Sequence, residues 1–192
     1  MATRNILKDG DEGLTKKSRA ITDFNDRLHI LLDDMRETLI EANGLGLAAP
    51  QVGVLRRAAV IVDTSIESEL PEDQVVELIN PEIISNEGEQ TGSEGCLSVP
   101  GVYGIVTRPE SVEIKAQDRF GNDFKMQGTE LTARAICHEI DHLDGKVFLS
   151  LVERLLTEEE IAELIAGREE EEETAETEEE TEEETETETE EV

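Results

Sequence analysis

The sequence is poor in basic residues. It has 17 Lys and Arg against 48 Asp and Glu, and its formal net charge is −31 over 192 residues. Residues 169–192 contain 16 Glu and neither Lys nor Arg, but the first 168 residues are acidic as well. Because nucleic acids and anionic lipids repel such a chain, we expect no direct nucleic-acid binding and no attachment to anionic membranes.

Long hydrophobic runs are also missing. The longest strongly apolar stretch is residues 58–62, and the first five residues contain no apolar signal core. We therefore expect no membrane span and no standard export signal, which favours a cytoplasmic protein. The chain has two cysteines, Cys96 and Cys137, and in this setting free thiols are expected rather than a disulfide.

The composition divides the chain into one domain and a tail. Residues 1–166 are long enough for a single hydrophobic core, and we predict one folded domain there. Residues 167–192 are rich in Glu and Thr, with almost nothing apolar to bury and like charges at helical spacing. We expect this tail to be disordered and to serve solubility, with partner binding as the alternative.

Hydrophobic periodicity predicts an α+β fold. Mostly antiparallel sheets should pack around a central helix that carries two histidines, with an amphipathic helix near the N-terminus and the disordered acidic tail at the end. The predicted elements are a helix over 23–42, strands over 57–63, 74–80 and 82–85, a hairpin of 111–118 and 124–127, a histidine-bearing helix that starts at Thr129 or Thr132 and ends near Gly145, and a last helix from Thr157.

The most informative motif is His138-Glu139-Ile140-Asp141-His142. Histidines at positions i and i+4 lie on one face of a helix and can bind one metal ion, while the intervening Glu139 can act as general base on a water. The pattern indicates a metal-dependent hydrolase and leaves the third ligand open.

Several residues compete for that third position. The metzincin form requires a further His where this chain has Phe148, so it is excluded. A thermolysin-like site would use a downstream Glu such as Glu163. Cys96 lies between glycines and prolines that should fix a loop, which suits a thiolate ligand. Cys137 points about 100° away from His138 and is expected in the core.

A glycine-rich segment, residues 44–53, precedes these motifs. It lacks the Lys-Ser/Thr of a phosphate-binding loop and follows a helix rather than a strand, so phosphate binding is not expected. We interpret Gly46 as a position where a bound peptide approaches the backbone, and Gln51 as an amide donor to an oxyanion.

Taken together, Gly44–Gln51 (GLGLAAPQ), Glu94–Ser98 (EGCLS) and His138–His142 (HEIDH) make the chain resemble the peptide deformylases over about residues 3–155. The resemblance implies that Cys96, His138 and His142 bind the metal. It also implies ferrous iron as the cofactor, replaceable by zinc, nickel or cobalt. Donor type alone would have suggested zinc first.

The resemblance further implies removal of the formyl group from N-formylmethionyl nascent peptides, with release of formate. Glu139 would be the general base, and the Gln51 amide and the Leu97 backbone N–H would hold the oxyanion. A basic C-terminal helix associated with ribosome docking in some relatives is replaced here by Glu-rich sequence. We still expect a transient association with the ribosome, but the sequence does not contain the basic helix that would dock there.

Further positions are expected to bind substrate. Leu131 and Ala135 share the histidine face of the helix and should line the methionine pocket, and the resemblance adds Leu45 and Glu94 as neighbours. Arg134 is expected to pair with a carboxylate such as Glu94. Arg108 is interpreted as either a surface charge or a peptide contact.

Two other functions stay open at this point. The first is a peptidase that uses Glu163 as the third ligand. The second is a metal-stabilised binding module without activity, although such proteins usually lose the base or the oxyanion donor, and both Glu139 and Gln51 are present.

Overall fold

The computed structural model describes residues 2–68 and 70–167, and its contacts divide the chain into two compact units, Met1–Leu155 and Leu156–Val192. The first unit is built from two antiparallel sheets and two α-helices. The predicted α+β class with mostly antiparallel sheet is thereby confirmed. Within the described residues, no helix is both long and apolar enough to cross a membrane.

The larger sheet has five strands in the order β1-β2-β3-β6-β7, and all neighbouring strands are antiparallel. Its inward positions are buried Val, Ile, Leu and Ala side chains, which form two of the hydrophobic clusters. The bounds of the strands are β1 Gly46–Ala48, β2 Ala58–Val62, β3 Val75–Glu87, β6 Ser111–Gln117 and β7 Asp123–Thr129.

Strand β3 runs through the point where the sequence predicted a break before Pro81. The pairing of β3 with β6 shifts register between Ile79 and Glu82, and Asn80 there has a φ of 51°. Because a bulge of this kind leaves one residue outside the ladder, Pro81 needs no backbone hydrogen bond there. The predicted strands over 74–80 and 82–85 are therefore one strand.

The smaller sheet was not predicted. It consists of β4 (Gln90–Cys96), β5 (Val99–Arg108) and β8 (Arg154–Leu155) in the order β4-β5-β8. Strand β4 contains glycines and no alternating apolar residues, and β5 contains Pro and Gly, so neither has the usual strand pattern. As a result Cys96 lies at the end of a strand, rather than in the rigid loop that we expected.

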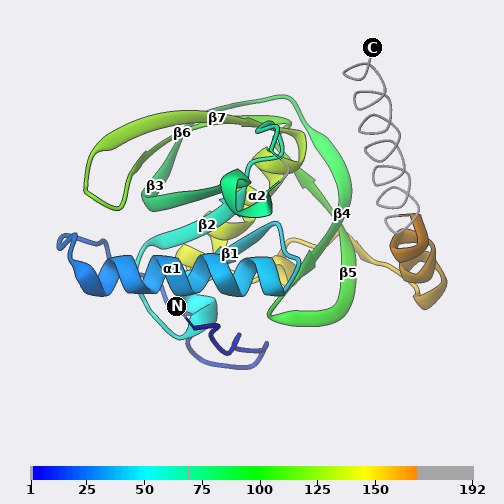
Figure 1. The fold of residues 1–192 in the computed structure, drawn as a ribbon. Coiled ribbons are helices and arrows are strands. Elements are labelled where there is room, and N and C mark those ends of the chain that lie inside the picture. The colour runs from blue at the N-terminus through cyan, green and yellow to red at the C-terminus, as the bar shows by residue number, and fades with distance from the viewer. Residues whose placement is uncertain (1, 69, 168–192) are drawn as a thin grey trace, which may run out of the picture. The chain divides into compact units, whose positions relative to one another are not determined.

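Helix α1 (Asp26–Glu41) is the predicted amphipathic helix. Asn25 caps it by accepting hydrogen bonds from the backbone N–H groups of Arg27 and Leu28, at 3.0 and 3.3 Å. Its buried face, which includes Leu32, Met35 and Leu39, packs on β1 and β2. Figure 1 shows α1 in blue beneath these strands, with the β4–β5 hairpin at the right.

Helix α2 (Glu130–Leu143) carries the histidines and contacts β1, β2 and β7. Thr129 occupies the N-cap position, but its side chain makes no capping hydrogen bond. Thr132, the alternative cap, is buried inside the helix, and its hydroxyl lies 3.1 Å from the Thr64 backbone N. The helix ends before Gly145, whose φ of 77° is in the left-handed region that favours glycine.

In the second unit, a helix extends from residue 158 to residue 167. The backbone N–H of Thr157 donates to the Glu160 carboxylate at 2.8 Å, and the Glu160 N–H donates to the Thr157 hydroxyl at 3.2 Å. This reciprocal pair confirms the predicted capping box. The tail expected to be disordered, residues 167–192, lies outside the described residues apart from its first position.

Candidate active site

Cys96 from the end of β4 meets His138 and His142 from α2. The three potential ligand atoms lie within 4.8 Å of one another, and Cys96 Sγ is 3.2 Å from His142 Nε2. Both histidines are buried and Cys96 is partly buried. Within the described part of the chain, this is the group of His, Cys, Asp and Glu close enough to bind one ion.

The donor set fits a metal ion. One thiolate and two imidazoles are common ligands of zinc and of other first-row transition metals, and three protein ligands leave a position open for water or substrate. Among the described residues, the buried Glu139 Oε2 and His142 Nδ1 atoms have no hydrogen-bond partner. A buried carboxylate oxygen without a partner next to the ligands is typical of a site completed by water, substrate or metal.

Glu94 supports His138 from behind. Its carboxylate lies 3.1 Å from His138 Nδ1 and accepts hydrogen bonds from Arg108 at 2.8 and 3.0 Å and from Arg134 at 2.9 Å. When Nδ1 carries the proton, the His138 Nε2 lone pair is free to bind a metal. The predicted pairing of Arg134 with Glu94 is confirmed.

Arg108 is neither the surface charge nor the peptide contact that the sequence suggested. It is buried at the end of β5, and it donates to Glu94 and also to Asp141 at 2.6 Å. Asp141 belongs to the HEIDH motif, and its part in this network was missed. The only sequence signal was its place within the motif, since hydrophobic periodicity does not show which charged residues are buried in pairs.

The pKa values in the site follow from burial and from these partners. Burial would raise the pKa of Glu94, but hydrogen bonds from His138 and Arg108 outweigh it and lower the pKa to about 2. Burial raises the pKa of Glu139 to about 7. For His142, burial and the nearby His138 lower the pKa to about 3, so its ring is neutral and can act as a ligand.

The pKa of His138 shifts in the opposite direction from that of His142. Burial lowers its pKa, but hydrogen bonds with Cys96 and Glu94 and the charge of Glu139 raise it to about 10. The surrounding anionic groups therefore favour one positive charge at this point. The same anionic groups would also stabilise a divalent cation bound beside the thiolate.

Gln51 is held in a defined orientation by the short 3-10 helix η1 (Ala49–Val52). Its side-chain carbonyl oxygen accepts the Ala48 backbone N–H at 2.8 Å. The Nε2 group therefore points the other way, 3.2 Å from Ser98 Oγ and 3.6 Å from Cys96 Sγ. A buried amide N–H next to the thiol is positioned to donate to a group bound there.

The N-terminal segment connects two of the motifs. The Leu7 backbone N–H donates to Gln51 O at 2.7 Å, and the Asp9 N–H donates to Ser98 O at 2.8 Å. Lys8 Nζ also donates to Leu97 O, at 2.9 Å. These bonds fix Gln51 and Leu97, which come from separate parts of the chain, against the same entry segment.

The other predicted positions differ in exposure. Leu45 and Leu131 are 40% and 49% exposed, whereas Ala135 is buried in a hydrophobic cluster with Ile61 and Ile136. Cys137 is buried in the same cluster as expected, and burial raises the pKa of its thiol to about 11. Glu163 belongs to the second unit and is not in the ligand group.

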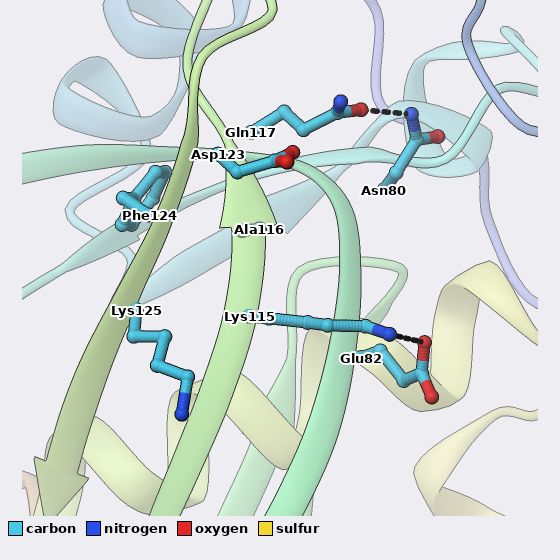
Figure 2. A pocket seen from close by; sticks show the side chains of 8 residues that line it. All are labelled: Asn80, Glu82, Lys115, Ala116, Gln117, Asp123, Phe124 and Lys125. Carbon is cyan, nitrogen blue, oxygen red and sulfur yellow. Dashed lines mark hydrogen bonds and ion pairs between the residues drawn. The ribbon is translucent and has the colours of Figure 1, made fainter.

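A separate hollow of about 770 Å³ lies on β3, β6 and β7 (Figure 2). Four of its polar side chains pair with one another: Asn80 Nδ2 donates to Gln117 Oε1 at 2.8 Å, and Lys115 pairs with Glu82 at 2.8 Å. The hollow contains none of the predicted site residues, and its charged groups do not converge on a common point as those around His138 do.

A helix with two histidines, a glutamate between them and a thiol beside them is typical of a metal-dependent hydrolase. The family model for polypeptide deformylase matches residues 3–158. A peptide deformylase of Caldicellulosiruptor bescii is 54% identical over 84% of this chain and 92% of its own length. One from Lachnoclostridium phytofermentans is 51% identical over 90% of this chain and its entire own length.

Solved structures agree with these relatives. The crystal structure of a peptide deformylase from Legionella pneumophila has a TM-score of 0.72 and 41% identity, and it covers 87% of this chain and 92% of the other. The chain belongs to the polypeptide deformylase family. It is an enzyme of that class, a hydrolase that removes the N-formyl group from the terminal methionine of newly synthesised peptides and releases formate.

Proposed function

We propose that Cys96, His138 and His142 bind the divalent metal on which deformylase activity in this family depends. The observation that carries the proposal is the convergence of their ligand atoms within 4.8 Å beside the buried Glu139. We propose ferrous iron as the metal, replaceable by zinc, nickel or cobalt, on the strength of the family resemblance. The thiolate and two imidazoles suit each of these ions.

Glu139 is the general base in this proposal. When bound, the metal supplies Lewis acidity, which makes water a better nucleophile near neutral pH. Glu139 accepts the proton of the attacking water and transfers it to the leaving amine. Without a metal, burial raises the pKa of Glu139 to about 7, which makes its carboxylate a stronger base than an exposed one. A bound cation favours the carboxylate and lowers this pKa.

Gln51 and Leu97 stabilise the oxyanion that forms when the formyl carbon is attacked. The bond from Ala48 N–H fixes the Gln51 amide so that its Nε2 faces Cys96 and Ser98. Leu97 follows Cys96 directly, and its backbone N–H is the second donor that we propose. Each such donor typically lowers the barrier by about 3–4 kcal/mol.

The peptide contacts that we propose are Leu45, Gly46, Leu131 and Ala135. The exposure of Leu45 and Leu131 supports a role in binding the apolar methionine side chain. Glu94 differs from these, because Arg108, Arg134 and His138 already occupy its carboxylate. We propose that Glu94 acts through His138 and does not touch the substrate.

The catalytic domain that we propose spans residues 1–166, with 167–192 as an appended acidic segment. The match of the family model to residues 3–158 supports this division. We place the enzyme in the cytoplasm, in transient association with ribosomes, because formylated nascent chains arise there. A peptide deformylase of Acinetobacter baumannii, 30% identical over 79% of this chain and 99% of its own with a TM-score of 0.72, has been solved with Met-Ala-Ser bound.

Metal content of two variants tests the ligand set. Cys96→Ser should lose most of its metal after dialysis, because a hydroxyl is a poor ligand beside two imidazoles. Glu163→Gln should retain about one ion per chain. The reverse result would favour a peptidase with Glu163 as third ligand and would overturn this site.

A further inference from the structure

Gly46 lies against Glu139, and there is no room between them for a side chain. A Cβ atom built on Gly46 would lie 2.8 Å from both Cγ and Cδ of Glu139 and closer still to Oε1. Real Cβ atoms essentially never approach other heavy atoms within 3.0 Å. Three consecutive atoms of the Glu139 side chain are involved, so rotation of the carboxylate alone would not relieve the clash.

The backbone conformation does not explain why glycine is at this position. Gly46 is not among the glycines with positive φ, and in β1 it pairs with Ile61 of β2 in an ordinary antiparallel register. An alanine could adopt this conformation without strain. The missing side chain therefore provides space, and Glu139 fills that space.

Neither partner can move away easily. Glu139 is 2% exposed and belongs to α2, which packs on β1 and β2, while Ile61, the partner of Gly46 in β2, is fully buried. In a close-packed interior, an added methyl group forces side chains off their rotamers. The smallest available adjustment is a change in the Glu139 side chain itself.

We propose that Gly46 is a positioning residue for Glu139: its hydrogen side chain sets where the carboxylate lies beside Cys96, His138 and His142. This rests on the proposed role of Glu139 as general base. It differs from the peptide approach that we inferred from the sequence, because it acts in the enzyme without substrate. It also links the first motif of the chain to the third through direct contact.

The steric part is tested by unfolding temperature, which does not depend on activity. Gly46→Ala should lower Tm by roughly 3–9 °C, the usual result of overpacking in a domain of this size. In the Glu139→Gln background, where the side chain keeps its length, the decrease should be the same. In the Glu139→Ala background, where Cγ, Cδ and Oε1 are gone, it should disappear. An equal decrease in all three backgrounds would overturn the proposal.

The catalytic part is tested by kinetics on formyl-Met-Ala-Ser. Gly46→Ala should lower kcat about 100-fold, as displacement of a reacting group by about 1 Å commonly does. KM should stay within roughly threefold and metal content near one ion per chain, because the added methyl group is directed at Glu139, the Gly46 backbone can still contact the peptide, and no ligand changes. A rise in KM with unchanged kcat would show that Gly46 serves peptide binding alone, and would overturn the positioning role.

Gly44→Ala is the matched comparison in the same segment. A Cβ there would meet the Cδ1 atoms of Leu97 and Leu39 at 2.9 and 3.1 Å, which are ends of flexible side chains. Its effect on kcat should be much smaller than that of Gly46→Ala. An equal loss would attribute the effect to any side chain in this segment and contradict the proposal. Full activity in Glu139→Ala would instead refute the general-base role, while the Tm test of the steric contact would still stand.

Discussion

Two groups of buried polar atoms lie at the histidines of α2, and they differ in how completely they are hydrogen-bonded. Behind His138, the Glu94 carboxylate is bonded to Arg108, Arg134 and the imidazole itself. By contrast, Glu139 Oε2 and His142 Nδ1 are buried and have no hydrogen-bond partner among the described residues.

This difference in pairing distinguishes the residues that fix the geometry of the site from the carboxylate that takes part in the reaction. A fully paired buried network fixes its members in one geometry, and loss of one member leaves the others as uncompensated charges. A buried carboxylate without a partner is costly for the folded chain, and the cost is relieved when water or substrate binds. We therefore expect changes in the paired group to alter metal affinity and stability, and loss of the unpaired Glu139 carboxylate to alter turnover.

The largest effect should come from Glu139→Ala. Removing the general base should abolish measurable turnover, because the water then has no acceptor for its proton. Metal content should remain near one ion per chain, since Glu139 is not a ligand. Formate release and metal analysis on the same preparation measure both quantities. Retained turnover would refute the base assignment.

Gln51→Ala should lower kcat by about two to three orders of magnitude, the usual effect of losing one oxyanion donor. The side chain also accepts the Ala48 N–H, so some loss of stability is expected alongside. Gln51→Glu keeps that acceptor but loses the amide donor, and it should be at least as slow as Gln51→Ala, with its own loss of stability because the new carboxyl group is buried. If Gln51→Glu is fully active, the donor role is excluded.

Glu94→Gln breaks the paired group. We expect a loss of about 3 kcal/mol in unfolding free energy at neutral pH, because Arg108 and Arg134 lose their buried carboxylate. Metal affinity should fall about 10–100-fold, because His138 loses the partner that orients it. Chemical denaturation and metal titration measure these two changes.

The difference in unfolding free energy between the native enzyme and Glu94→Gln should depend on pH in one direction. The pKa of Glu94 is about 2 in the folded protein and 4.5 for a carboxyl group without partners. The stability that its negative charge contributes is therefore fully present above about pH 4.5 and is lost as pH falls through 2. The stability gap between the native enzyme and Glu94→Gln should therefore narrow as pH falls from 4.5 toward 2. A gap that does not change over this range would show that the Glu94 charge has no part in it.

Deleting residues 169–192 should have the smallest effect. This segment carries 16 of the acidic residues, and the family model ends at residue 158. We expect kcat/KM on a short formyl-methionyl peptide to be unchanged within about twofold, apart from screened long-range repulsion. A large loss that persists at high salt would assign the segment a direct role in catalysis.

The sequence allowed the α+β class, α1, the helix of the paired histidines and three motifs to be predicted, because each depends on local periodicity or on fixed spacing. The smaller sheet was missed because β4 and β5 are held by pairing with each other and with β8, and not by an alternating apolar pattern. Pro81 suggested a strand break, which a bulge in β3 avoids.

Within the site, Arg108 and Asp141 illustrate a second limit. Their chemistry depends on burial and on a partner from a distant part of the chain, and neither is visible in local sequence. Gly46 shows the same limit. The sequence indicated that a small residue is required at this position, but the side chain that occupies the space beside it is that of Glu139 in α2. Such contacts follow only from the assembled tertiary structure.

The most direct test of the central claim is formate release from formyl-Met-Ala-Ser by the full chain purified without oxygen, with metal analysis of the same sample. We predict steady formate production and about one divalent ion per chain, both lost when a chelator removes the metal and regained when ferrous iron is restored. Formate production that continues undiminished in metal-free protein would contradict a metal centre formed by Cys96, His138 and His142.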